Sequence, residues 1–222
     1  MLNTLDHYIP RSLDHITGQF THDSKLEQKV SYIGSYLPYW ANTVVFDLDG
    51  PAKQRLAAIR DGLYNAAGFM LADKLNADTF HMTLHDLVNH PGFPQEDEAA
   101  DRAAAGARSL IEQWRGQKHL QMRGTWIFNM CQTSVVLGLV PNNHETYLRM
   151  CRMYDDLQQV VPLDYDLCPH ITLAYFKPGM YEQHQVQALR SYLHMEPIIM
   201  DLAMEDLHLQ SFTDMNHYEN IF

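Results

Sequence analysis

The chain has 222 residues, 46% of them apolar and 19% charged, and its 27 acidic and 16 basic side chains give a net charge of −11. A chain of this length buries about 70% of its extended surface on folding, so it can form a core without disulfides or metals, and global disorder is excluded. Its apolar runs are far shorter than the ~20 residues that cross a bilayer, which excludes an integral membrane protein. The acidic balance disfavours non-specific binding of long nucleic acid, whereas a few side chains could still bind one phosphate.

The N-terminus and the cysteines indicate the compartment. The first fifteen residues contain no apolar stretch of the kind that an export signal requires, so we expect a cytoplasmic protein. Cys131, Cys151 and Cys168 are 20 and 17 positions apart. This spacing favours neither a disulfide framework nor a CxxC zinc or redox site, and we expect reduced thiols.

The first predicted strand and helix follow a segment without a clear pattern. Residues 1–41 show no sustained period and are interpreted as an N-terminal extension with no assigned role. Residues 43–48 are β-rich and end at Asp49-Gly50-Pro51, which is typical of a helix start. Apolar residues at three- and four-residue steps then predict a helix that ends at Gly68.

The rest of the chain continues this alternation of strands and helices. Periodicity, turn residues and helix propensity predict the following elements in order: strand 79–88, helix 95–115, strand 134–140, helix 144–159, strand 169–176, helix 182–194 and a final strand region 198–210.

Two landmarks recur at nearly the same offset. The run Val44-Val45-Phe46-Asp47-Leu48 precedes Val135-Val136-Leu137-Gly138-Leu139 by 91 positions. His81-Met82-Thr83-Leu84 precedes His170-Ile171-Thr172-Leu173 by 89 positions. The shared offset indicates a duplicated βαβαβ unit, and two such units facing one another would form a cleft between them.

Composition alone does not account for the two HxTL motifs. A random order of these residues gives about 0.08 such quartets, a product of residue frequencies, and two occur. Two further HxT triplets, His15-Ile16-Thr17 in the extension and His144-Glu145-Thr146 on a predicted helix, lack the leucine and the strand. We therefore assign a function only to the HxTL pair.

Strand geometry explains the HxT spacing. Residues i and i+2 of a strand share a face, so His81 lies beside Thr83, and His170 beside Thr172. A pseudo-twofold axis would aim both pairs at one point between the lobes. Displacement at phosphorus uses such a set, with one histidine as general base, the other as general acid, and the hydroxyls on the non-bridging oxygens. No metal or other cofactor is required, and two coupled histidines predict a bell-shaped pH profile.

With these motifs the chain resembles the 2H phosphoesterase superfamily, which includes the bacterial RNA 2',3'-cyclic phosphodiesterases, also called 2'-5' RNA ligases. The resemblance runs from about residue 42 to residue 222 and includes both HxTL strands and the closing Leu207-His208-Leu209-Gln210-Ser211. It implies one bilobal α+β domain, in which two pseudo-twofold-related lobes with mostly antiparallel sheets, at about 42–130 and 131–222, flank a central cleft.

The same resemblance implies metal-independent phosphodiester chemistry, with His81 and His170 as catalytic residues and Thr83 and Thr172 as phosphate ligands. We expect hydrolysis of 2',3'-cyclic phosphates on RNA ends or nucleotides, with RNA ligation as a further activity of this group. The alternative substrates are a cyclic or 2'-5' oligonucleotide signal and a nucleotide-derived small molecule. The expected partner is thus a nucleotide or a short RNA end. We expect a monomer and no association with a membrane.

Residue Tyr175 departs from the pattern of the group. RNA-acting members often have arginine at this position, three residues after the second threonine. A tyrosine there could stack on a base or hydrogen-bond a phosphate, which makes Tyr175 a candidate substrate ligand. Its odd offset from His170 instead favours the core-facing side of the strand. The N-terminal extension could also cover the cleft and narrow the range of substrates.

Two other interpretations stay open. His81 and His85 are four positions apart on one strand, with Asp86 adjacent and His90 nearby, and these residue types bind zinc. The second copy has Ala174 at the position of His85, which argues against a metal site. A binding module without catalysis is the other alternative. Its weakness is that binding alone does not need two titratable groups, and turnover decides between the two.

Overall fold

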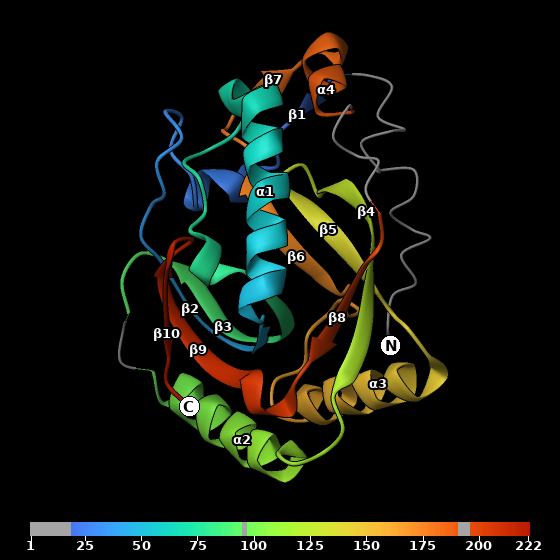
Figure 1. Cartoon of the computed structure of the whole chain (residues 1–222). Coiled ribbons are helices and arrows are strands. Elements are labelled where there is room, and N and C mark those ends of the chain that lie inside the picture. The colour runs from blue at the N-terminus through green and yellow to red at the C-terminus, as the bar shows by residue number, and fades with distance from the viewer. Residues whose placement is uncertain (1–18, 95–96, 191–195) are drawn as a thin grey trace.

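The computed structural model describes residues 19–94, 97–190 and 196–222. This part of the chain forms two four-stranded antiparallel sheets, so the predicted α+β class with mostly antiparallel sheets is confirmed (Figure 1). The strands of the first sheet, in spatial order, are β10 (His217–Asn220), β9 (Leu207–Asp214), β2 (Tyr39–Asp47) and β3 (His81–Pro91). Those of the second sheet are β6 (His170–Tyr175), β5 (Ser134–Pro141), β4 (Leu120–Met130) and β8 (Ile198–Leu202).

The helices lie where the sequence predicts them, and capping explains where they begin. They are α1 (Gly50–Ala67), α2 (Glu98–Trp114), α3 (His144–Gln158) and α4 (Gln183–Arg190). The Asp49 side chain accepts the N–H of Ala52 at 2.6 Å, and the Asn143 side chain accepts the N–H of Thr146 at 2.8 Å. The end expected for the last helix falls on residues 191–195, which lie outside the described residues.

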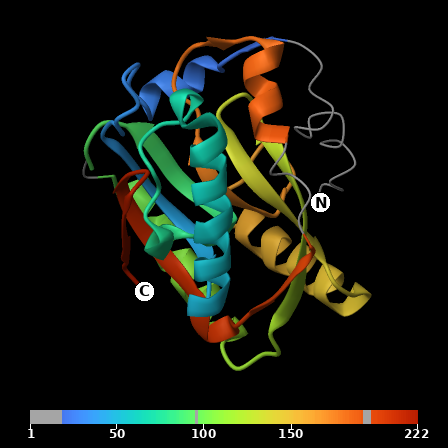
Figure 2. The ribbon, with the colours of Figure 1, turned by 45° about the horizontal axis from the view of Figure 1, so that its top comes forward.

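Helices cover both sides of the two sheets. α2 contacts β2, β3 and β9 of the first sheet. α3 contacts β4 and β5 of the second sheet and also β3 of the first, and the two helices contact each other. They lie below the sheets in Figure 1, and α1 runs across the front, where it contacts α4 and β6. Figure 2 shows α1 and α4 next to one another from above. One buried cluster includes Phe46 and Met82 of the first sheet and Leu137 and Ile171 of the second, so the sheets share a core.

The sheets exchange strands between the two halves of the sequence. β4, which the sequence analysis does not predict, ends the first half but pairs with β5 of the second sheet. In the second half, β8 stays in the second sheet beside β4, whereas the next strand, β9, pairs with β2 of the first sheet. Each half of the chain therefore contributes strands to the sheet of the other half, β4 from the first and β9 with β10 from the second.

The segment before β2 packs into the fold. Of the expected extension 1–41, residues 1–18 with the His15 triplet lie outside the described residues. Strand β1 (Phe20–Thr21) pairs with β7 (Met180–Tyr181) in the short two-stranded sheet. A 3-10 helix (Ser24–Gln28) follows, and the side chains of Leu26 and Val30 are completely buried in the common core. Burial of these apolar side chains ties the segment to both halves of the molecule.

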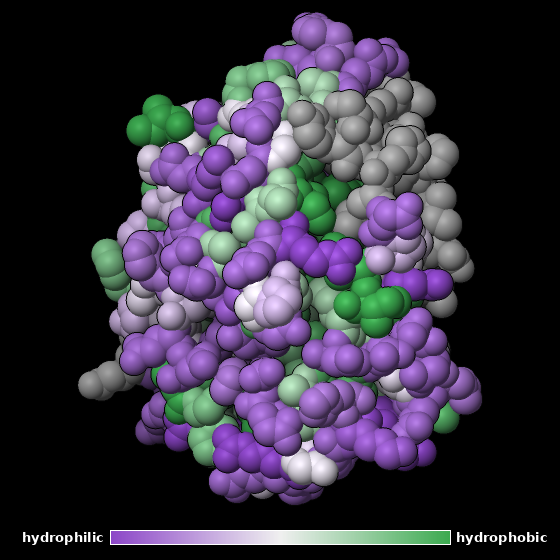
Figure 3. Space-filling model, viewed as in Figure 1, coloured by the Kyte–Doolittle hydropathy of each residue, from purple (hydrophilic) through white to green (hydrophobic). Residues whose placement is uncertain are grey.

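The face of the molecule shown in Figure 3 is mostly hydrophilic. Among the described residues, no helix has the length and apolar character needed to span a membrane.

Candidate active site

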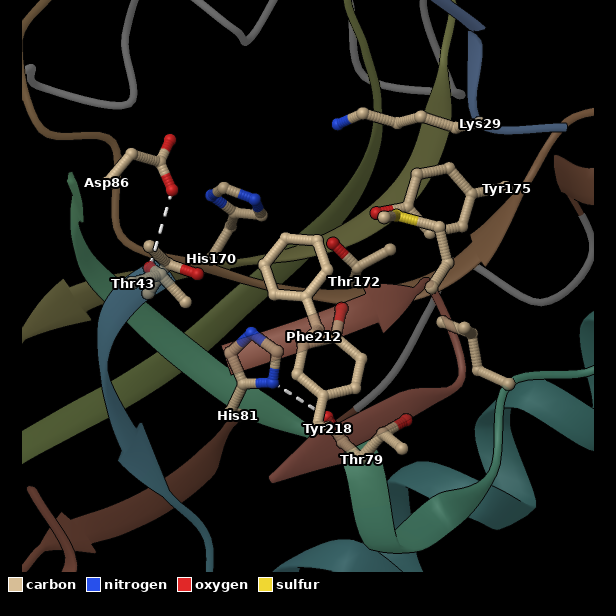
Figure 4. A pocket seen from close by; sticks show the side chains of 13 residues that line it. Lys29, Thr43, Thr79, His81, Asp86, His170, Thr172, Tyr175, Phe212 and Tyr218 are labelled. Atoms are coloured by element: carbon tan, nitrogen blue, oxygen red, sulfur yellow. Dashed lines mark hydrogen bonds between the residues drawn. The ribbon is translucent and has the colours of Figure 1, made fainter. Parts of the chain in front are cut away.

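Both HxTL motifs open an edge strand. β3 begins at His81 and β6 at His170, and these two strands contact one another without joining one sheet. We call this line of contact the seam. A pocket of about 170 Å³ opens there, and its lining includes every predicted site residue: His81, Thr83, His170, Thr172 and Tyr175. Figure 4 shows His81 and His170 reaching into this pocket from different strands.

The two histidines make the same hydrogen bond. Nδ1 of His81 donates to the carbonyl of Thr79 at 2.7 Å, and Nδ1 of His170 donates to the carbonyl of Cys168, also at 2.7 Å. A carbonyl can only accept, so each Nδ1 carries the proton. In the neutral ring Nε2 is then left with a lone pair, which can take a proton from a reactant.

Burial keeps both rings neutral in the ligand-free protein. Desolvation lowers the pKa of His81 to about 4, the hydrogen bond to Thr79 opposes this, and a charged His170 lowers it further. Desolvation also lowers the pKa of His170, against the hydrogen bond to Cys168 and the nearby Asp86 carboxylate. A charge on His170 acts against a charge on His81, so the two rings are not both charged at once.

Both edge strands have a bulge at the same place in the repeat. The pairing of β2 with β3 passes over Leu84, and the pairing of β5 with β6 passes over Leu173. An extra residue reverses the alternation of faces, so the fifth residue after each histidine returns to the pocket side. Those residues are Asp86 and Tyr175, and both line the pocket. The expectation that its odd offset turns Tyr175 into the core is therefore wrong.

The same bulge changes the position of His85. Its side chain is 1% exposed, its ring lies tilted against that of Tyr154 with the ring centroids 5.2 Å apart, and it does not line the pocket of His81. His90 packs on Trp40 at 5.0 Å, outside that lining as well. The proposed zinc ligands thus do not converge, and the described ranges contain no group of three potential metal ligands. The shared face expected for His81 and His85 is wrong because Leu84 interrupts the alternation.

Lys29 is a pocket residue that the sequence analysis missed. It follows the 3-10 helix of the N-terminal segment, and its Nζ lies 4.7 Å from the centroid of the Tyr39 ring. Burial lowers the pKa of this amine. Its Nζ forms no salt bridge with any carboxylate of residues 19–94, 97–190 and 196–222. In Figure 4 it enters from the side opposite the histidines, where it can pair with a bound anion.

Aromatic and acidic side chains complete the pocket. The Tyr218 ring lies 5.0 Å from that of His81 and 4.9 Å from that of Phe212, and both aromatic residues come from the strands at the C-terminal end. On the other side, Asp86 accepts a hydrogen bond from the Tyr165 hydroxyl at 2.7 Å. Tyr218, Phe212 and Tyr165 belong to no recognisable motif, so no sequence signal could have found them, and Asp86 was noted only as a candidate metal ligand.

Comparison with known proteins places the fold. No protein-family profile and no curated protein matches the sequence. Among solved structures, a conserved protein of unknown function, ATU0111 from Agrobacterium tumefaciens, aligns over 99% of this chain and 98% of its own, with a TM-score of 0.63 and 18% identity. TT0787 of Thermus thermophilus aligns over 82% of this chain and 95% of its own, with a TM-score of 0.51 and 13% identity. These likenesses establish a shared fold.

A more distant structural neighbour is LigT of E. coli in complex with phosphate, at a TM-score of 0.43 and 15% identity over 83% of this chain and 96% of LigT.

Proposed function

We propose that this chain is a metal-independent phosphodiesterase of the 2H type, which hydrolyses 2',3'-cyclic phosphates of nucleotides or RNA ends. The observation that carries the proposal is the matched pair of histidines in one pocket. Both use Nδ1 to donate to a backbone carbonyl two residues earlier, and both keep Nε2 for chemistry. A residue that only filled space would not need this arrangement in both halves of the chain.

The pocket suits one phosphate group. Its volume of about 170 Å³ is small, and it combines two hydroxyls, Thr83 and Thr172, with the amine of Lys29. The threonines can donate to the non-bridging oxygens, and Lys29 can neutralise their charge. Burial raises the pKa of Tyr175, so its hydroxyl stays protonated and can act as a further donor.

We assign the base to His81 and the acid to His170. The carboxylate of Asp86 favours the charged form of either ring, but a charge on His170 lowers the pKa of His81, so the neutral ring is assigned to His81 and the proton to His170. Nε2 of His81 takes a proton from water as the water oxygen forms a bond to phosphorus. The bond from phosphorus to one ribose oxygen breaks, and this oxygen keeps the electron pair and receives a proton from His170. The products are a phosphomonoester and a free ribose hydroxyl, and solvent returns the proton from His81 to His170.

A cyclic phosphodiester fits this machinery because its leaving oxygen stays attached to the same ribose. One phosphate subsite with a base and an acid beside it is then sufficient. A cyclic or 2'-5' oligonucleotide signal would undergo the same steps, so a panel of such compounds tests the substrate class together with the reaction.

The experiment is turnover of 2',3'-cyclic mononucleotides, 2'-5' and 3'-5' dinucleotides and cyclic dinucleotides by the full chain, followed by 31P NMR. We expect a single phosphomonoester from the cyclic mononucleotide, at the same rate with and without a chelator. The pH profile of kcat/KM should be bell-shaped, with its optimum on the acid side of ~6.5, because burial lowers both histidine pKa values.

Absence of turnover on the whole panel, or loss of turnover with the chelator, would overturn this proposal. Turnover of the linear compounds alone would keep the chemistry and change the substrate class.

A further inference from the structure

A second cavity lies directly beside the phosphate-sized pocket. Its volume is about 400 Å³, against about 170 Å³ for the first, and three residues border both: Thr83, Asp86 and His170. We call it the second chamber. A group attached to a phosphorus atom between the two histidines can therefore extend past His170 into this space.

The second chamber differs from the first pocket in polarity. Its described lining contains the carboxylates of Asp86 and Asp166 and no lysine or arginine. The remaining surface comes mainly from aromatic and aliphatic side chains, which are Leu84, Met130, Tyr154, Leu163, Tyr165 and Leu167. A second phosphate would meet negative charge without a cation, whereas a flat neutral ring would meet apolar surface and aromatic rings.

His85 gives the chamber a polar contact. Its side chain is 1% exposed and lines the chamber, and no described residue satisfies either ring nitrogen with hydrogen-bond geometry. Burial lowers the pKa of His85, and the nearby backbone of Asp86 and then its carboxylate oppose this shift. The neutral ring has one donor and one acceptor, and leaving both unpaired in a buried site is costly. These two groups match the donors and acceptors on the edge of a heteroaromatic ring.

The repeat shows that the fold does not require this histidine. Ala174 occupies the corresponding place after the second HxTL motif, next to the corresponding bulge, and it is completely buried. A small apolar residue therefore suffices for the strand and its packing. His85 is an addition to one half only, on the side where the second chamber lies.

We propose that the second chamber binds the nucleobase of the nucleoside whose oxygen leaves phosphorus, and that His85 hydrogen-bonds the edge of this base. The inference rests on the proposed function, because it places the leaving oxygen next to His170. Tyr154, 5.2 Å from the His85 ring, and Tyr165, whose hydroxyl is held by Asp86, supply aromatic surface for the base.

Binding separates this proposal from the reaction. Isothermal titration with 3'-AMP and with inorganic phosphate measures occupancy of both cavities or of the phosphate-sized pocket alone. In His85→Ala, which copies the residue of the second repeat, we expect the affinity for 3'-AMP relative to phosphate to fall about 10-fold. Leu163→Phe, which fills the chamber from its rim, should give the same selective loss if His85→Ala fails to fold. His90→Ala, outside both cavities, should change neither affinity.

An equal loss of both affinities, or no loss of either in a folded variant, would overturn the nucleobase site. A selective loss in a protein without phosphodiesterase turnover would keep the nucleobase site and remove the proposed reaction. Turnover of a cyclic phosphate with unchanged 3'-AMP binding in both variants would do the opposite.

Discussion

The two HxTL strands differ in ways that separate chemistry from recognition. Both strands hold the histidine through a carbonyl two residues earlier, and both have a bulge three residues after it. Beyond that point they diverge, because the first has His85 and Asp86 where the second has Ala174 and Tyr175. What the halves share acts on the symmetric part of the proposed substrate, the phosphate. The residues that the halves do not share make the two sides of the pocket different. The two oxygen substituents of a phosphodiester differ in the same way.

Substitution of either HxTL histidine tests the chemistry that the two halves share. His81→Ala and His170→Ala should each lower kcat/KM on a 2',3'-cyclic nucleotide by ~10²-fold or more, since proton transfer in the transition state is lost. The double variant should be little worse than either single one, because the two residues act in one step. His144→Ala, which removes the exposed histidine of the HxT triplet on α3, is the matched control and should keep the wild-type rate. Rates close to wild type in either single variant would refute the assignment.

Lys29 tests the contribution from outside the repeat. Lys29→Ala should raise KM about 10-fold, because a buried charge-assisted contact to the phosphate is lost, and Lys29→Arg should restore part of it. Lys25→Ala removes an exposed amine from the 3-10 helix that precedes Lys29 and serves as control. Steady-state kinetics at fixed ionic strength measure the effect, and equal changes in both alanine variants would mean that only net charge matters.

The hydroxyls of Thr83 and Thr172 test whether the two halves bind the phosphate equally. Thr83→Val and Thr172→Val should each lower kcat/KM by about 5-fold, as expected for one hydrogen bond to a non-bridging oxygen. Thr213→Val on the exposed side of β9 is the corresponding control. Similar losses at both positions support equal roles, whereas a loss at one position only would show that the phosphate sits off the pseudo-twofold axis.

The free energy of unfolding at acid pH should depend on the buried, neutral ring of His81. The pKa of His81 is about 4 in the folded protein, below its ordinary value, so the unfolded chain binds more protons between about pH 6.5 and 4. The stability that neutral His81 contributes is complete above pH 6.5 and is lost as the pH falls through this window. We expect His81→Gln to reduce the loss of unfolding free energy between pH 7.5 and 5 by about 1 to 2 kcal/mol. Urea titrations at both values measure it, and an unchanged loss would show that His81 is accessible to water.

Local signals in the sequence were sufficient for most elements and for the histidine pair. Asp49 and Asn143 are side chains that cap helices by contacts within four residues, and the HxTL motif depends only on strand alternation. The bulges at Leu84 and Leu173 left no such signal, because they are set by pairing with β2 and β5. For this reason alternation alone misplaced His85 and Tyr175.

Features that depend on contacts between distant parts of the chain could not be predicted from local sequence patterns. Lys29 belongs to an aperiodic segment, and only the burial of Leu26 and Val30 brings it to the seam. The positions of β4 and β9 depend on pairing across the whole chain. Local sequence does not predict with which strand each of them pairs.

The exchange of β4 and β9 has a consequence for how the molecule folds. Neither four-stranded sheet can be completed from one half of the sequence, because β4 has to reach the second sheet and β9 the first. The pairings that complete both sheets join residues far apart in the sequence, so we expect the two sheets to form together in one cooperative step.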